Sequence, residues 1–175
     1  MKTNEFKNIL FEYFNAKICI EFPELSGKVF RERLRINQPN YPFLVLKSGE
    51  RSRINKRFEH FTKDEIEYTR VQYRMPVTFS IHDIRKNPVD AEAFSDTVID
   101  YVERFFADND STHTDLRQKN IVINELLISG VRDTSAFSKT AQEFVKEIDV
   151  VFEFEDVSCI TSEEGKDISI DIVSR

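Results

Sequence analysis

An uninterrupted alternation of apolar and polar residues over residues 71–81 constrains the fold of this chain most. The odd positions are all apolar, and the even positions hold polar residues or proline. A period of two over this length predicts a strand with one face on a core and the other in water. Pro76 cannot donate a ladder hydrogen bond, so the strand is expected to be an edge or to have an irregular neighbour there. Ile66 and Tyr68 are in the opposite phase, which predicts a bulge or break between residues 68 and 71.

An amphipathic helix is predicted directly after this strand, over residues 88–106. Asn87 is a good N-cap, and Pro88 suits the first helical position. The apolar residues of the segment recur at helical spacing and form one stripe: Phe94, Val98, Tyr101, Val102 and Phe105. A half-buried strand and an amphipathic helix can cover each other, so this pair is expected to form the core.

The rest of the chain predicts a second helix and several further strands. Residues 3–19 have the apolar spacing of a helix, and strands are expected over residues 29–36, 43–46, 121–131 and 144–157. Residues 110–120 and 132–142 are expected to be polar connections. Ile168, Ile170 and Ile172 alternate with polar residues, so this segment could pair with the preceding strand or with a neighbouring molecule.

This order of elements predicts one α+β domain over the 175 residues. We expect a mainly antiparallel β-sheet with two amphipathic helices packed on it and a protruding β-hairpin or loop arm. The arm would comprise residues 47–64, where cations alternate with aromatic side chains: Arg51, Arg53, Lys56, Arg57, Phe58 and Phe61. Two interpretations are open: an arm that binds a partner or faces nucleic acid, or a solvated hairpin whose aromatic residues fold back on the domain.

The charges are distributed unevenly along the chain, whose formal net charge is −6. Residues 1–86 contain 17 Lys and Arg against 11 Asp and Glu, whereas residues 87–175 contain 8 against 20. The asymmetry is either incidental or the sign of one basic and one acidic face, which would allow copies to associate head to tail. The acidic side of the 144–157 strand, predicted to be a solvated or lumen-facing surface, consists of Glu147, Asp149, Glu153 and Glu155.

The sequence shows no arrangement of residues typical of an active site or a metal centre, so we expect no enzymatic activity and no cofactor. No two of the three histidines have the spacing of a zinc-binding helix. A calcium-like run begins at Asp108, but it lacks the central glycine and has Lys119 at the position of the bidentate glutamate. No serine lies in a nucleophile elbow, and four glycines are too few for a phosphate-binding loop to be expected.

Composition also indicates the cellular compartment and the classes of partner to expect. Cys19 and Cys159 lie in no motif, which favours two buried thiols in a reducing compartment. No apolar run is long enough to span a bilayer, so no membrane association is expected. The acidic balance disfavours specific binding of nucleic acid, because phosphate contacts dominate such affinity.

The segment Arg35-Ile36-Asn37-Gln38-Pro39-Asn40-Tyr41-Pro42-Phe43-Leu44-Val45 resembles the Asn-Gln…Pro-aromatic-aliphatic signature of the neck and tail-terminator proteins of tailed bacteriophages. The order of N-terminal helix, signature, hairpin arm, long strand, helix and closing strand is similar to that family over about residues 3–156. Residues 157–175 would be a C-terminal extension. One departure is Asp83-Ile84-Arg85-Lys86, which replaces a glycine-containing turn before the second helix.

The resemblance implies a virion protein that assembles in the host cytoplasm into a ring, commonly six-fold, on the end of the tail tube. Such a ring stops tube polymerisation and joins the tail to the head-side connector and neck proteins. It can also contact the sheath, and DNA passes through it without specific binding. Arg51, Arg53, Lys56, Arg57, Phe58 and Phe61 are then expected at the subunit or tube interface, with the acidic strand face lining the channel or opposing the arm.

Two alternatives remain open from the sequence. The first is a head-completion or baseplate component, which has similar sequence properties. The second is a monomeric cytoplasmic binding module that recognises a protein or peptide through an exposed strand edge, such as one near Pro76.

Overall fold

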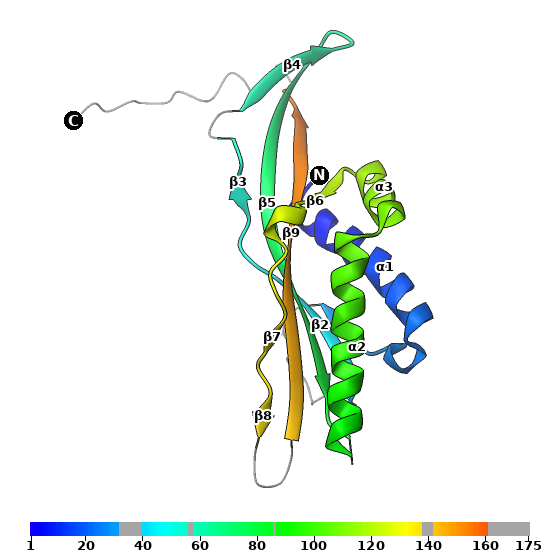
Figure 1. Cartoon of the computed structure of the whole chain (residues 1–175). Helices are drawn as coiled ribbons and strands as arrows, with labels where there is room; N and C mark the ends of the chain where they lie inside the picture. The colour runs from blue at the N-terminus through cyan, green and yellow to red at the C-terminus, as the bar shows by residue number, and fades with distance from the viewer. Residues whose placement is uncertain (32–39, 56–57, 86, 138–141, 161–175) are drawn as a thin grey trace, which may run out of the picture.

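A mixed, mostly antiparallel open sheet has the helices packed on one of its faces, which confirms the α+β class (Figure 1). The computed structural model describes residues 1–31, 40–55, 58–85, 87–137 and 142–160. Within these residues the helices are α1 (Thr3–Glu21), α2 (Pro88–Ala107) and α3 (Asp110–Gln118), with short 3-10 helices at Pro23–Leu25 and Glu125–Leu127. The strands are β1 (Val29–Arg31), β2 (Phe43–Ser48), β3 (Ser52–Arg53), β4 (Glu59–Lys63), β5 (Ile66–Asp83), β6 (Ile121–Ile123), β7 (Arg132–Asp133), β8 (Ala136–Phe137) and β9 (Gln142–Cys159).

Two long strands, β5 and β9, form the spine of the sheet, whose order is β1-β2-β5-β9-β6. They pair antiparallel without interruption from Tyr68 opposite Cys159 to Asp83 opposite Phe144. The predicted bulge between residues 68 and 71 is therefore wrong. The backbone register continues through these residues, but the apolar side chains change from even to odd positions. They change because the part of β5 before residue 71 extends beyond the helices, and the helices determine which face of the strand is buried (Figure 1).

The core is a layer of phenylalanine and aliphatic side chains between the sheet and the helices. It takes the odd positions of β5 from Val71 to Ile81 and the even positions of β9 from Ile148 to Phe154, as the alternation predicted. The Phe79 ring lies 4.9 Å from that of Phe14 and 5.0 Å from that of Phe106. Strand β5 is thereby fixed against both α1 and α2.

The two long helices form where the sequence predicted them. In α1 every fourth residue from Phe6 to Ile18 is buried. In α2 the Asn87 side chain accepts a hydrogen bond from the backbone N–H of Val89, and Pro88 occupies the first helical position. Strand β2 is buried on both faces at residues 43–46, as its continuous apolar run indicated.

Three predictions about the second half of the chain are wrong. Residues 110–118 form helix α3 instead of a polar linker, because the Asn109 side chain caps the helix and Thr112 and Leu116 are enough to bury one side of it. Only residues 121–123 of the predicted 121–131 strand are in a strand, and a 3-10 helix follows. The segment 132–142, predicted as a connection, contains the short strands β7 and β8, which both pair with β9.

The irregular neighbour predicted for Pro76 is present. Strand β2 ends at Ser48, and the chain resumes pairing with β5 only at Ser52, opposite Arg74. Between them, the backbone N–H of Gly49 donates to the Pro76 carbonyl at 2.8 Å. A Cβ on Gly49 would lie 2.8 Å from the Pro76 Cγ, so the close approach requires glycine. Because β5 lies inside the sheet at this point, the exposed edge expected near Pro76 is not there.

Several predicted features lie outside the described residues: Lys56, Arg57, the strand over 167–173, residues 32–36 of the predicted 29–36 strand and residues 35–39 of the phage-like segment. Strand β9 continues to Cys159, so residues 157–159 belong to the sheet. Both cysteines are free, but only Cys19 is partly buried and Cys159 is exposed, so the expectation of two buried thiols is wrong for Cys159.

Candidate interaction surface

The arm consists of β3, β4 and the adjoining part of β5, and it extends past the helical layer (Figure 1). Strand β4 pairs with β5 from Glu59 opposite Arg70 to Lys63 opposite Ile66. The two residues between the strands, Asp64 and Glu65, have φ values of 52° and 64°. Positive φ at both central positions is the geometry of the type I′ turn, which matches the twist of a hairpin. The sequence predicted this arm but lacked the usual Asn-Gly signal for its turn.

The arginines of the arm have different roles. The Arg51 guanidinium lies 4.5 Å from the centre of the Tyr73 ring and donates to the Thr3 hydroxyl at 2.7 Å. It therefore ties the base of the arm to the start of α1. The Arg53 guanidinium covers the Phe58 ring at 5.0 Å, and Phe58 remains 50% exposed. Arg53 and Phe58 are thus the predicted interface residues that remain most available to a partner.

Phe61 lies on the other side of the arm from this pair. Its ring stacks on Tyr68 at 5.3 Å and is covered by the Arg70 guanidinium at 5.0 Å. Strand alternation places Phe61, Tyr68 and Arg70 on the face of the sheet opposite the helices. The arm consequently presents aromatic and cationic groups on both of its faces instead of on a single one.

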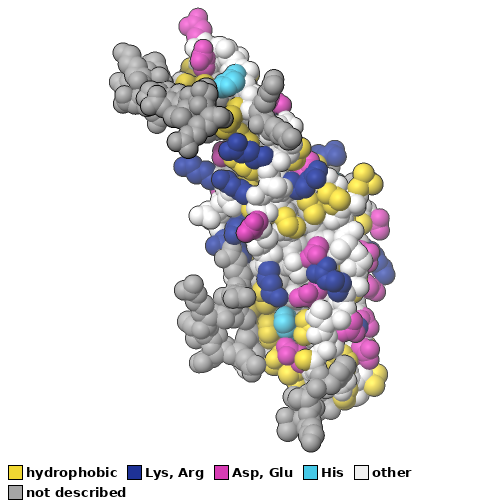
Figure 2. Space-filling model, turned by 90° about the vertical axis from the view of Figure 1, so that its left-hand side faces the viewer, with side chains coloured by type: hydrophobic (Ala, Val, Ile, Leu, Met, Phe, Trp, Pro, Cys, Tyr) yellow, Lys and Arg dark blue, Asp and Glu magenta, His cyan; other side chains and the backbone are white. Residues whose placement is uncertain are grey.

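The face of the sheet opposite the helices, here called the open face, has the four acidic residues predicted on β9 (Figure 2). Each has a polar or cationic neighbour. Glu153 accepts from the Arg74 guanidinium at 2.8 Å, and Glu155 accepts from the Gln72 amide at 3.1 Å. The Arg74 cation offsets the charge of Glu153, and Arg70, 3.7 Å from Glu155, offsets that of Glu155, whereas the Gln72 amide is neutral.

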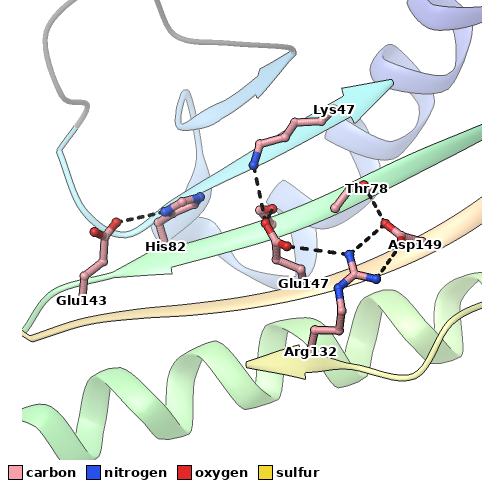
Figure 3. A network of polar contacts seen from close by, with 8 residues as sticks. Lys47, Thr78, His82, Arg132, Glu143, Glu147 and Asp149 are labelled. Atoms are coloured by element: carbon pink, nitrogen blue, oxygen red, sulfur yellow. Dashed lines mark hydrogen bonds and ion pairs between the residues drawn. The ribbon is translucent and has the colours of Figure 1, made fainter. Parts of the chain in front are cut away.

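The lower part of the acidic row is held by a network (Figure 3). Glu147 accepts from Ser80 at 2.6 Å and lies 3.5 Å from the Lys47 ammonium. Asp149 accepts from Thr78 at 2.6 Å and from Arg132 at 2.6 Å. Burial alone would raise the pKa of Glu147, but these hydrogen bonds and cations lower it on balance. The pKa of Asp149 is lowered chiefly by the Arg132 hydrogen bond.

The open face is therefore a mixed ladder of charges and not a bare acidic surface. Its acidic residues were identified from the sequence. The pairing of Arg132 with them was missed, because that residue lay in a segment predicted as a connection. Whether the ladder lines a channel stays a prediction. The described arm residues Arg51 and Arg53 lie against Tyr73 and Phe58, and the acidic row takes its cations from β2, β5 and β7.

A second polar cluster joins β2, β5 and β9 at the opposite end of the sheet. The His82 ring stacks on Phe43 at 4.6 Å, and its Nδ1 lies 2.9 Å from Glu143 Oε1. The Tyr41 hydroxyl donates to the same oxygen at 3.2 Å. Burial first, and then the charge of Glu143, raise the pKa of Tyr41. His82 and Tyr41 both contact Glu143 Oε1, so this one carboxylate oxygen links β5, β9 and the residues just before β2.

The junction before α2, which departs from the phage signature, is held by ion pairs. Arg85 donates to the buried Asp83 at 2.7 Å and to Glu24 at 2.8 Å, and its guanidinium lies 4.3 Å from the centre of the Phe94 ring. Burial raises the pKa of Asp83, although Arg85 opposes the shift. The ion pairs of Arg85 with Asp83 and Glu24 therefore hold this junction, where a glycine-containing turn was expected.

An apolar edge at residues 122–131 was missed by the sequence reasoning. Four large hydrophobic side chains there are at least 40% exposed, and Leu126 is 94% exposed: Val122, Leu126, Leu127 and Val131. The segment was predicted to be one strand, in which half of these residues would have been buried. The early end of β6 and the following 3-10 helix turn them outward instead.

The uneven charge of the chain is also a spatial feature. Helices α2 and α3 contain seven acidic and two basic residues. They lie together on one side of the sheet (Figure 1), whereas the open face has Lys47, Arg70 and Arg74 beside its acidic residues (Figure 2). An acidic helical side and an open face that includes cations are compatible with association between copies.

The described residues contain no group of three His, Cys, Asp or Glu side chains placed to hold a metal ion. Among the helices described, none combines the length and hydrophobicity needed to cross a membrane. Neither the models of known protein families nor the curated proteins give a match to this chain. The phage resemblance therefore depends on the residues quoted for it and on the order of the elements.

Proposed function

We propose that this protein is a structural virion component that forms a ring on the tail tube of a phage, ends tail polymerisation and joins the tail to the head-side connector. The observation that carries the proposal is the arm. A hairpin extends past the helical layer and exposes Arg53 and Phe58, which are suited to contact a neighbouring subunit. Aromatic and arginine side chains are the types most enriched at interface hot spots.

Two further features support the same function. The α+β fold has the helix, strand, arm, long strand, helix and closing strand in the order that the phage resemblance implies. The acidic helices and the cations of the open face lie on opposite sides of the sheet, which is compatible with a head-to-tail contact between copies. A heterologous contact of this kind closes into a ring when its rotation permits.

Light scattering over a wide concentration range, with negative-stain imaging of any large species, tests this proposal. We expect a ring with a central hole. Arg53→Glu should weaken assembly at least about tenfold in concentration, equivalent to about 1.4 kcal/mol per contact, while the circular dichroism spectrum stays unchanged. Lys119→Glu, which makes the same charge change beside α3, is the matched control. Equal assembly of both variants would exclude the arm as the interface.

Co-purification separates the terminator from a head-completion or baseplate component. A ring that caps the tail should be recovered with the tail tube protein and with neck proteins. Recovery with portal or adaptor proteins alone would favour head completion.

A monomeric protein-binding module is the second candidate, and one observation favours it. Among the described residues strand β4 pairs with β5 alone, so its other edge offers backbone groups to an extended peptide. A mass that stays monomeric at every concentration, with and without tail tube protein, would favour this function over the ring.

A further inference from the structure

The hydrophobic side of strand β5 reverses within one continuous strand. From Val71 to Ile81 the apolar residues face the helices, whereas Ile66 and Tyr68 face the open side. The pairing with β9 continues through this reversal without a bulge. The sheet therefore has two apolar surfaces, one on each face and at different heights.

The second of these surfaces, the arm apolar face, consists of Phe61 on β4, Ile66 and Tyr68 on β5, and Val157 on β9. Cross-strand register places all four on the open side of the sheet. Ile66 is 43% and Val157 42% exposed, and the two aromatic rings are half-buried against each other. The described helices all lie on the other side of the sheet (Figure 1), so none of them covers this face.

The described chain ends beside the arm apolar face. The backbone N–H of Ile160 donates to the Glu67 carbonyl at 2.8 Å, between Ile66 and Tyr68. Fifteen residues follow, and Ile168, Ile170 and Ile172 alternate there with Asp167, Ser169 and Asp171. This segment has the pattern of a strand with one apolar face, the complement that the arm lacks.

In the same chain, the strand edge nearest to the end of the described residues at Ile160 belongs to β9 and is short. Strand β6 pairs with β9 at residues 152–154, and the Met1 amine binds the Glu155 carbonyl at 2.6 Å. Within the described part of the chain only residues 156–159 of β9 remain beyond these contacts, whereas the alternating segment spans residues 167–173. The free edge of β4, at Glu59–Lys63, is longer and borders the arm apolar face through Phe61.

We propose that residues 167–173 of one copy add as a strand to the free edge of β4 in the next copy, with the three isoleucines on the arm apolar face. The inference rests on the proposed self-assembly and names the contact that produces it. Each copy donates one segment and accepts one, which is the heterologous contact that a closed ring needs. The polar residues of the segment then face the side of His60 and Thr62.

A disulfide trap between two different variants tests the contact directly. One protein carries Thr62→Cys, and the other carries Asp167→Cys, Ser169→Cys or Asp171→Cys, so that the register is sampled. Both also carry Cys159→Ser, which removes the exposed native thiol. We expect covalent dimers on mixing under oxidising conditions, and none when Glu92→Cys on α2 replaces Thr62→Cys. No cross-link at any of the three positions would overturn the proposal.

Combining Thr62→Cys and Ser169→Cys in one chain separates exchange from self-pairing. Exchange between copies predicts a ladder of covalent oligomers, and a monomer with an internal disulfide as the main product would overturn the proposal. Truncation after Ile160 should raise the concentration for half-assembly at least about tenfold. Ile170→Asp should act likewise, unlike its neighbour Ser169→Asp.

The light-scattering outcomes distinguish the two proposals. Assembly of the full chain with loss of assembly on truncation supports both. Equal assembly of the full and truncated chains overturns strand exchange and leaves the ring intact. A full chain that stays monomeric in all conditions overturns both.

Discussion

The two ends of strand β5 obey the same backbone geometry but bury opposite faces. Residues 71–83 lie under α1 and α2 and bury their odd positions, whereas residues 66–70 lie in the arm and place their apolar side chains on the open side. The difference shows that the inward face of a strand is chosen by the layer that packs on it and not by the strand itself. It also distinguishes a buried core from a partly exposed apolar surface.

The largest expected effect contrasts one phenylalanine from each end. Phe79→Ala should lower the free energy of unfolding by about 3–5 kcal/mol, because the ring is fully buried between Phe14 and Phe106. Phe61→Ala should cost about 1 kcal/mol or less, because its ring is half-buried on one neighbouring ring. Equilibrium urea unfolding measures both. Equal losses would show that the arm is as firmly packed as the core.

The next effect concerns the point where β5 changes neighbours. Gly49→Ala should destabilise the fold by about 1–3 kcal/mol, because its Cβ would lie 2.8 Å from the Pro76 Cγ. Pro76→Ala in the same chain removes that Cγ and should recover part of the loss. Urea unfolding of the two single variants and the double variant gives the coupling. Strict additivity would contradict a steric origin.

Sequence alone predicted the elements in which a single periodic pattern of apolar residues packs against a single neighbouring layer. The alternation of residues 71–81 and the cap at Asn87 predicted β5 and α2, and the missing N–H of Pro76 predicted its irregular neighbour. Helix α3 was missed because only Thr112 and Leu116 face inward, which is too few for an amphipathic signal.

The candidate surface was predicted less completely for a related reason. The cationic and aromatic residues of the arm were visible, but their division between two faces depends on register with β5, which no local pattern specifies. The compensation of the acidic row required Lys47 and Arg132 to come from two distant strands. The exposed edge around Leu126 follows from where β6 ends, and strand ends are poorly marked in sequence.

A smaller effect is expected at the tip of the arm. Glu65 has a φ of 64°, a conformation that costs a non-glycine residue about 1 kcal/mol, so Glu65→Gly should stabilise the hairpin by up to that amount. Hydrogen exchange at the β4 amides reports this more directly than global unfolding, because arms open locally. Glu67→Gly, inside β5, is the matched control and should accelerate exchange. Acceleration in both variants would rule out relief of turn strain.

The smallest effect concerns the open face and depends on pH. Arg132 lowers the pKa of Asp149 below its ordinary value of about 3.8, and it contributes with Ser80 and Lys47 to the lowered pKa of Glu147. Carboxylates with a lowered folded-state pKa stabilise the fold above about pH 4 and lose that contribution as the pH falls through the folded-state value. The side chain of Arg132 is 44% exposed, so the gain at neutral pH is about 1 kcal/mol or less.

Arg132→Met should therefore lower the free energy of unfolding slightly at pH 7, and the difference from the wild type should shrink towards zero between about pH 4 and pH 2. Urea unfolding across that range measures it. Arg104→Met removes the same charge from α2 and should show a weaker dependence on pH in the same window. A constant difference for Arg132→Met would mean that its packing along β7, and not the charge ladder, holds the open face together. The fold would then not depend on the ion pairs of the open face. Its cations could pair with a neighbouring copy instead, which would leave the acidic row as the contact or channel surface that the sequence suggested.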